Sequence, residues 1–126
     1  MRVLIDTHIL LWILSDDPKL TPKARRVLQD ASEVYVSAAS FWEIAIKKGL
    51  GKIDVDLDEL RTACGMSGIY ELPVTVDHTL GLLALAPLHK DPFDRLIVAT
   101  AKTEPMRLLT ADSAVAGYTE LAILVR

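Results

Sequence analysis

The sequence predicts one α/β domain over residues 1–126, built around a mostly parallel sheet. Short apolar runs rich in β-branched residues alternate with segments that show helical periodicity. Those runs lack the polar alternation of a strand that faces water, which favours strands buried on both faces. No repeat, low-complexity tract or linker-like stretch divides the chain. Strands that alternate with helices predict an α/β sandwich.

The first third of the chain predicts two strands separated by two helices. Residues 2–5 form a short β-branched run without polar alternation that ends at Asp6, which predicts a strand. Residues 9–14 are apolar nearly all round, so we expect a buried helix there. A second helix is predicted over 21–29, because a proline follows the threonine at its start. Residues 34–36 predict the next strand.

The middle of the chain predicts two helices, a strand and another helix. Residues 37–48 begin with a serine that can cap a helix, and two glycines follow its end. Residues 56–64 open with a capping-box pattern. Residues 69–74 predict a strand, and Pro73 places its end there or the strand at an edge. Residues 77–86 predict a helix.

The clearest helix start of the chain lies at Asp91-Pro92. Asp91 fits the cap and Pro92 the first turn, so we expect a helix over 91–102. Residues 108–110 predict a buried strand that ends near an acid and is followed by a short helical turn. Residues 123–125 predict the last strand.

Composition limits the setting in which this chain works. Hydrophobic residues make up 51% of it, which is enough for a real core. The single cysteine, Cys64, excludes an internal disulfide and argues against a zinc knuckle, and it favours a reducing cytoplasm. No apolar run is long enough to cross a bilayer, and Asp6 interrupts the first one. We therefore expect a cytoplasmic protein.

Two acids follow predicted strands. Asp6 and Asp112 each sit at or just beyond the end of an apolar strand. In parallel α/β sheets, ligands bind in the crevice beyond the carboxyl ends of the strands, so both carboxylates can enter it. A polar residue that simply ends a strand at a turn is the alternative for each acid taken alone.

Two further acids lie on predicted helices, on faces that are largely apolar. Glu43 shares its face with alanine, isoleucine and leucine, and an ordinary ion pair with Lys47 is the alternative. Asp94 shares its face with residues 97, 98 and 101, and stabilisation of the helix dipole is its alternative. Because Asp91 already serves the cap, a second acid on the apolar side needs another reason.

Clustered carboxylates predict a site for a hard metal ion. Burying a carboxylate without a partner is costly, and a divalent cation can offset that cost. Mg²⁺ and Mn²⁺ prefer oxygen ligands, and no Cys or His pair near these acids favours zinc. Such an ion can lower the pKa of a water molecule and stabilise charge on a phosphodiester.

Net charge bears on the substrate. The chain has 17 acidic and 14 basic residues, a net charge of −3 that at first argues against nucleic acid. Setting the four acids aside leaves 13 acids against 14 bases, so the remainder is nearly neutral. Five basic residues lie near these acids in sequence and could contact phosphates, although a solvated face explains them as well: Lys47, Lys48, Lys52, Lys90 and Arg95.

Four motifs follow in order along the chain: IDTHILLW at 5–12, SAASFWEIAIK at 37–47, HKDPFDRL at 89–96 and LTAD at 109–112. Together they resemble the PIN-domain ribonucleases, specifically the toxin component of VapBC-type toxin–antitoxin pairs, over almost the whole chain. The resemblance implies a PIN-like three-layer α/β/α sandwich with a central mostly parallel sheet. It also implies a Mg²⁺- or Mn²⁺-dependent endoribonuclease, a homodimer, and inhibition by an antitoxin whose tail enters or covers the acidic pocket.

The resemblance also implies the site residues. The acidic quartet that holds metal and performs catalysis would be Asp6, Glu43, Asp94 and Asp112. Thr7 and Thr110 resemble the hydroxyl residues that flank this quartet, while Arg95 would contact phosphate or pair with a neighbouring acid. Trp12 and Trp42 could stack on bases, with core or dimer contact as the alternative.

Two departures from the family pattern stand in this sequence. His8 occupies a position where many PIN domains have Asn or Ser, which is similar to a DTH-type branch of the family. We expect this histidine to serve packing and hydrogen bonding rather than metal binding. Residues 102–105 replace the usual glycine-containing turn before the last acid and leave all four acids in place.

Three other functions fit parts of the pattern. The same metal site could cleave DNA, because the metal acts on the phosphate whichever sugar is present. A phosphotransferase of the haloacid-dehalogenase kind would use Asp6 as nucleophile, but it normally has an acid where His8 stands. A non-catalytic protein could receive a basic peptide in its acidic pocket.

Overall fold

A five-stranded parallel sheet forms the centre of the protein. The computed structural model describes residues 1–88 and 90–125. Within them the strands lie in the order β3-β2-β1-β4-β5, and every neighbouring pair is parallel. The predicted parallel sheet is therefore confirmed, and the predicted edge position of the strand before Pro73 is too. The strands are β1 (Arg2–Ile5), β2 (Glu33–Ser37), β3 (Ile69–Leu72), β4 (Arg107–Thr110) and β5 (Ala122–Leu124).

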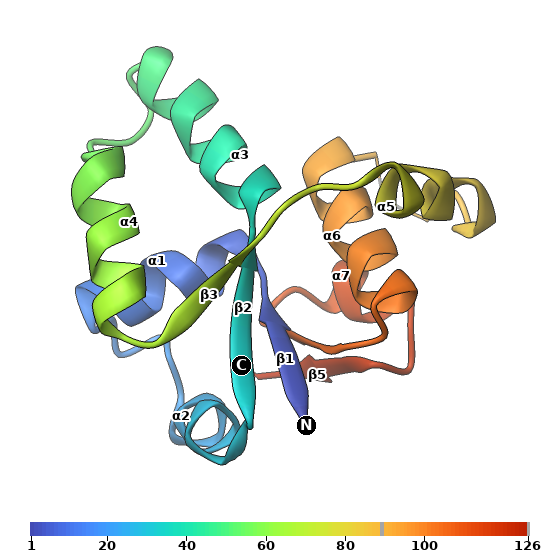
Figure 1. The fold of residues 1–126 in the computed structure, drawn as a ribbon, viewed down its shortest axis with the longest axis horizontal. Helices are drawn as coiled ribbons and strands as arrows, with labels where there is room; N and C mark the ends of the chain where they lie inside the picture. Colours follow the sequence, from blue (N-terminus) through green and yellow to red (C-terminus); the bar gives the residue numbers. More distant parts are fainter. Residues whose placement is uncertain (89, 126) are drawn as a thin grey trace.

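Helices cover both faces of the sheet, which gives the predicted three-layer sandwich. In Figure 1, α1, α2 and α4 lie on one side of the central strands, and α5, α6 and α7 lie on the other. No helix in the described part of the chain combines the length and apolarity needed to cross a membrane. The helices are α1 (Thr7–Ser15), α2 (Pro22–Asp30), α3 (Ala38–Gly49), α4 (Leu57–Met66), α5 (Val76–Leu80), α6 (Pro92–Thr103) and α7 (Ser113–Ala116), with a 3₁₀ turn η1 (Gly81–Ala84).

Side-chain caps explain where the longer helices begin. Ser37 accepts a hydrogen bond from the Ala39 amide at 3.0 Å, and so caps α3 directly after β2. Asp91 caps α6 in the same way, with proline in the first turn. These local contacts fix the points at which α3 and α6 begin, and thereby the positions of the acids they carry.

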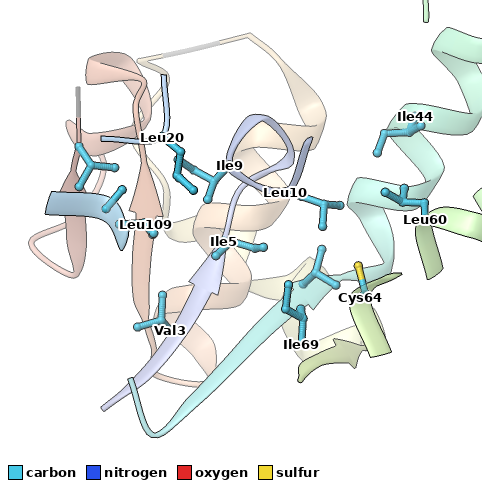
Figure 2. Close-up of a cluster of buried hydrophobic side chains, with 13 residues drawn as sticks. Val3, Ile5, Ile9, Leu10, Leu20, Ile44, Leu60, Cys64, Ile69 and Leu109 are labelled. Atoms are coloured by element: carbon cyan, nitrogen blue, oxygen red, sulfur yellow. The ribbon is translucent and has the colours of Figure 1, made fainter. Parts of the chain in front are cut away.

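The core has two halves, one on each face of the sheet. Val3 and Ile5 of β1 belong to the half under α1 and α4, whereas Leu4 belongs to the half under α6. Successive side chains of a strand point to opposite faces, so a continuous apolar run feeds both halves. Figure 2 shows the first half, in which Ile9 and Leu10 of α1 approach the strands.

We predict that Leu4→Ala destabilises the protein by about 2–5 kcal/mol. The Leu4 side chain is fully buried, so shortening it leaves a cavity in the core. The free energy of unfolding from urea titration checks this. Leu83→Ala is the matched control, since the Leu83 side chain in η1 is 86% exposed. If Leu83→Ala lost as much unfolding free energy as Leu4→Ala, the assignment of Leu4 to the core would be contradicted.

Two predicted helices differ from the structure. The helix expected over 77–86 is broken into α5 and η1. At the junction a Cβ on Gly81 would lie 2.9 Å from Thr103 Oγ1, so the chain passes too close to α6 for an ordinary side chain. In α1, Ile9 and Leu10 are buried as expected, but residues 11–14 are only half-buried. The expectation of a helix buried all round was therefore wrong for its second half.

The turn that lacks glycine, residues 102–105, joins three elements. The Glu104 carboxylate pairs with the buried ring of His78 in α5. The Arg2 guanidinium donates to the Glu104 and Pro105 carbonyl oxygens at 2.8 and 3.3 Å. This turn therefore connects α5 and the start of β1 to the end of α6. These contacts give the glycine-free sequence of the turn a structural role.

Candidate active site

The connection of the strands places a crevice next to β1. From β1 the chain builds β2 and β3 on one side, and it later returns to build β4 and β5 on the other. Ligands bind at such a change of direction, beyond the carboxyl ends of the two strands concerned. Asp6 directly follows β1 and Asp112 lies two residues beyond β4. The Asp6 amide still donates to the Leu109 carbonyl at 3.2 Å, which holds the two strand ends together.

Asp6 is a buried carboxylate whose two oxygens have different donors. Its side chain caps α1, with Oδ1 accepting from the Ile9 amide at 2.9 Å. The Thr110 hydroxyl donates to Oδ2 at 2.6 Å. The Thr110 oxygen in turn accepts from the Asp112 amide at 3.0 Å. That amide directs the hydroxyl proton toward Asp6, so β4 orients the acid that follows β1.

The electrostatic setting of Asp6 suits a cation. Burial raises the pKa of Asp6, while the hydrogen bonds from Thr110 and Ile9 and the charge of His8 act in the opposite direction. The charge of Asp94 also raises this pKa, which indicates that the two acids lie near each other. Among the described residues Asp6 has no basic partner within ion-pair distance. Each of its oxygens keeps lone-pair capacity beyond the one hydrogen bond it accepts.

We predict that Thr110→Val lowers the free energy of unfolding by about 1–3 kcal/mol, although the two side chains have nearly the same shape. The change removes the buried donor to Asp6 Oδ2 and the partly buried acceptor of the Asp112 amide. Urea titration measures the loss. Thr110→Ser keeps the hydroxyl, so it should recover most of the stability; an equal loss in both variants would show that the methyl group matters instead.

Glu43 reaches the same region from α3. Its side chain is buried, and Thr7 Oγ1 donates to Glu43 Oε1 at 2.8 Å. Ser40 Oγ lies 2.9 Å from Thr7 Oγ1, so its hydroxyl supports the same contact. Lys47 Nζ pairs with Glu43 Oε2 at 2.8 Å. The ion pair considered as an alternative for Glu43 is therefore present.

Lys47 lies among acids from two helices. Its hydrogen bond to Glu43 raises the pKa of Lys47, partial burial opposes this, and the charges of Asp91 and Asp94 raise it further. The ammonium group is therefore positively charged at neutral pH. Its position links the acid of α3 to the acids at the start of α6.

The two acids of α6 have different tasks. Asp91 Oδ1 accepts from the Phe93 and Asp94 amides at 2.9 and 3.1 Å, which confirms it as the helix cap. Asp94 stands in the first turn, and the side chains that share its face are buried.

Asp112 caps α7 through Oδ1, which accepts from the Ala114 amide at 2.8 Å. His89, in the third motif, lies outside the described residues.

A hollow opens where β1 and β4 end. It has a volume of about 310 Å³, and two of the four acids line it. The exposed His8 and the half-buried Trp12 are at its wall, with ring centroids 6.2 Å apart. A second hollow of about 410 Å³ between α3, α4 and β3 is mainly apolar and contains none of the four acids. The first hollow therefore brings together two of the predicted site acids, and its lining residues are Asp6, His8, Trp12, Ala111, Asp112 and Ser113.

The donor set fits a hard divalent cation by its chemistry. The groups gathered at this edge are carboxylates and hydroxyls, which suit Mg²⁺ or Mn²⁺ better than zinc. Within 1–88 and 90–125, however, no three His, Cys, Asp or Glu side chains are arranged closely enough to hold a metal as they stand. Both oxygens of Glu43 already have protein partners, and one oxygen of Asp112 is used by a cap. Of these contacts, the ion pair with Lys47 is the one that places a positive charge directly on a carboxylate oxygen of the predicted site.

Three further residues singled out in the sequence have clear positions. Arg95 Nη1 donates to the Ala86 carbonyl and the Tyr118 hydroxyl at 3.0 and 3.2 Å, so the side chain holds the loop before α6. Trp42 is 60% exposed, and its ring meets Phe93 edge-on at 4.9 Å. This side chain is therefore not part of the core. Trp12 is half-buried at the wall of the acidic hollow.

Comparison with protein families gives a match over most of the chain. The family model of the PIN domain matches residues 3–121. The chain is also similar to Ribonuclease VapC22 of Mycobacterium tuberculosis (strain ATCC 25618 / H37Rv), with 30% identity over 115 residues. That alignment covers 87% of this chain and 86% of the relative.

Solved structures share the fold at lower identity. A toxin–antitoxin complex from Klebsiella pneumoniae has a TM-score of 0.69 at 20% identity and covers 98% of both chains. VapBC2 from Rickettsia felis, bound to a DNA fragment from its promoter, has a TM-score of 0.70 at 17% identity, covering 98% of this chain and 97% of that one. VapC20 of Mycobacterium tuberculosis, a toxin that cleaves the Sarcin-Ricin loop, has a TM-score of 0.62 at 15% identity, with 94% and 97% covered.

Proposed function

Because the chain belongs to the PIN-domain family, we propose that it is a metal-dependent endoribonuclease and the toxin of a toxin–antitoxin pair. The observation that carries the proposal is the buried Asp6 at the crevice between β1 and β4, without a basic partner among the described residues. A solvated acid would be exposed, and the cap contact of Asp6 with Ile9 uses only one of its two oxygens. A carboxylate kept buried beside other acids is suited to hold a cation.

Each acid has a proposed role. Asp6, Glu43 and Asp94 would be the principal acids that hold Mg²⁺ or Mn²⁺, and Asp112 would complete the pocket directly or through water. Such an ion would lower the pKa of a water and stabilise charge on the phosphodiester. Thr7 and Thr110 would orient carboxylates, as their 2.8 and 2.6 Å contacts with Glu43 and Asp6 support.

RNA is the proposed substrate because the relative in the sequence comparison is named a ribonuclease. Nothing in the acidic hollow itself selects ribose, so DNA cleavage by the same residues is the second candidate. A non-catalytic module that receives a basic peptide would not need an oriented, buried Asp6. The haloacid-dehalogenase alternative loses its support, because the PIN-domain model matches residues 3–121.

A cleavage assay separates these functions. Purified protein, checked by mass spectrometry to be free of any co-purified antitoxin, is incubated with labelled RNA and with DNA of the same sequence. Each substrate is tested with Mg²⁺, with Mn²⁺ and with EDTA. We expect RNA to be cut in the presence of metal, no cleavage in EDTA, and intact DNA.

Each outcome of this assay decides between functions. Cleavage of DNA but not RNA would favour the second candidate. RNA cleavage that persists in EDTA would contradict metal dependence. No cleavage of either nucleic acid by folded, antitoxin-free protein would favour the non-catalytic module.

The proposed partners are a cognate antitoxin and a second copy of this chain. The solved structures that share this fold include a toxin–antitoxin complex from Klebsiella pneumoniae and VapBC2 from Rickettsia felis, which supports the first partner. A cytoplasmic location is proposed because the RNA substrate and a newly made antitoxin would meet the toxin there. Light scattering of the purified chain tests the dimer, with a monomeric mass as the contradicting result.

A further inference from the structure

Lys47 holds one carboxylate oxygen of Glu43, an acid of the proposed metal site. Its Nζ lies 2.8 Å from Glu43 Oε2, and the other carboxylate oxygen is held by Thr7. The Glu43 side chain is only 6% exposed, whereas the Lys47 side chain is 42% exposed. A buried acid is thus neutralised by a cation that reaches it from the surface. The charge of Asp94, which is also proposed to hold metal, raises the pKa of Lys47 as well.

We propose that Lys47 is an internal counterion that competes with the divalent metal for Glu43, so that metal binding requires the ammonium group to leave Oε2. The inference rests on the proposed metal site and adds a residue that regulates its occupancy. Without metal, Lys47 would satisfy Glu43 and keep the acids from repelling one another. With metal, the ammonium would turn outward into solvent.

The side chains allow this exchange. Thr7 orients the carboxylate through Glu43 Oε1, and Oε2 carries the Lys47 contact, so Oε2 is the oxygen at which we propose that two cations alternate. Lysine is a point charge on a flexible four-carbon stem, and its partly exposed position gives it water to turn into. A divalent ion and an ammonium group cannot share one oxygen without strong repulsion. The exchange also agrees with the finding that no three acids in the described residues are set for metal as they stand.

A second role for Lys47 would be a direct contact with the RNA phosphate. The two roles differ in what they predict without RNA. A phosphate contact leaves metal affinity unchanged when the lysine is removed, and only substrate binding or cleavage suffers. A competing counterion makes metal binding tighter when it is removed, whether or not RNA is present.

The test measures Mn²⁺ binding to the full chain without RNA, from the electron paramagnetic resonance signal of free Mn²⁺. Lys47→Met keeps an unbranched side chain, one atom shorter than lysine, and removes its charge. We expect Lys47→Met to bind Mn²⁺ about tenfold more tightly than the natural protein, equivalent to about 1.4 kcal/mol. We also expect the metal-free variant to unfold at a lower temperature, and added Mn²⁺ to stabilise it more.

Lys48→Met is the matched control on the same helix. Lys48 Nζ donates to the Val55 carbonyl at 2.6 Å, away from Glu43, so this variant should bind Mn²⁺ as the natural protein does. Lys47→Arg covers the case in which Lys47→Met fails to fold. Its forked group should hold the carboxylate more firmly and weaken Mn²⁺ binding.

The outcomes separate this inference from the proposed function. If the natural protein binds Mn²⁺ and Lys47→Met binds it equally or less tightly, the counterion role is wrong and the metal site stands. Unchanged Mn²⁺ binding in a folded Lys47→Arg variant would overturn the role as well. If the natural protein binds no Mn²⁺, the metal site and the counterion role both fail.

Discussion

Asp6→Asn should reduce metal-dependent RNA cleavage by about 10³-fold or more, while the protein remains folded. The change keeps the shape of the side chain and removes the negative charge that a cation requires. Asparagine is as good a helix cap as aspartate, so the contact with the Ile9 amide can persist. Burial raises the pKa of Asp6, which means that the folded state holds this charge at a cost. The unfolding temperature near neutral pH should therefore be unchanged or higher.

The measurement pairs initial cleavage rates with thermal unfolding of the same samples. Asp56→Asn is the matched control, because Asp56 caps α4 through the Asp58 and Glu59 amides and belongs to no proposed site. We expect the control to cut RNA at the natural rate. A folded Asp6→Asn protein that cuts equally well would remove Asp6 from the site, and loss of cleavage in both variants would indicate a general effect of the substitution.

The order of strands and helices could be predicted because its signals are local. Thr21, Ser37 and Asp91 cap their helices through amides two or three residues away, so sequence spacing alone reveals them. The apolar run at 3–5 predicted a strand buried on both faces, and its side chains do feed both halves of the core. These contacts need no knowledge of the rest of the fold.

The break between α5 and η1 could not be predicted in the same way. The pattern over 77–86 is helical, but the chain there lies against α6 at a distance set by Gly81 and Thr103. That contact joins residues 22 positions apart in the sequence, and no local rule contains it. The pairing of His78 with Glu104 has the same origin.

In the candidate site too, local signals could be predicted from the sequence, whereas contacts between distant segments could not. The positions of Asp6 and Asp112 after their strands followed from periodicity, and that of Asp94 from a helical face that is buried. The apolar face predicted for Glu43 was wrong in part, because Ile46 and Leu50 are exposed although Glu43 itself is buried. The contributions of Ser40 and Thr110 depend on hydrogen bonds between distant segments, such as Thr110 to Asp6. The resemblance pointed to Thr110, whereas no signal weighed in the sequence pointed to Ser40. Lys47 was visible as a partner of Glu43, but its relation to the acids of α6 appears only in the fold.

Asp94→Asn and Asp91→Asn form a pair that tests the assignment within α6. Both remove one negative charge from the first turns of the same helix, three residues apart. We expect Asp94→Asn to lower the rate of RNA cleavage by about 10²–10³-fold and Asp91→Asn to lower it by less than about threefold. Asparagine preserves the cap that Asp91 provides to the Phe93 and Asp94 amides, so both variants should remain folded.

Each variant loses one negative charge, and the charges of Asp91 and Asp94 both raise the pKa of Lys47. The loss of charge by itself therefore cannot explain a difference in cleavage between the two variants. The acids differ in that the charge of Asp94 also raises the pKa of Asp6. Cleavage rates over a range of Mn²⁺ concentrations measure the distinction. If Asp94 holds metal, the Asp94→Asn variant should need a higher Mn²⁺ concentration for cleavage than the natural protein. Equal rates in the two variants would mean that α6 supplies charge in general, and the quartet would then lose its third member.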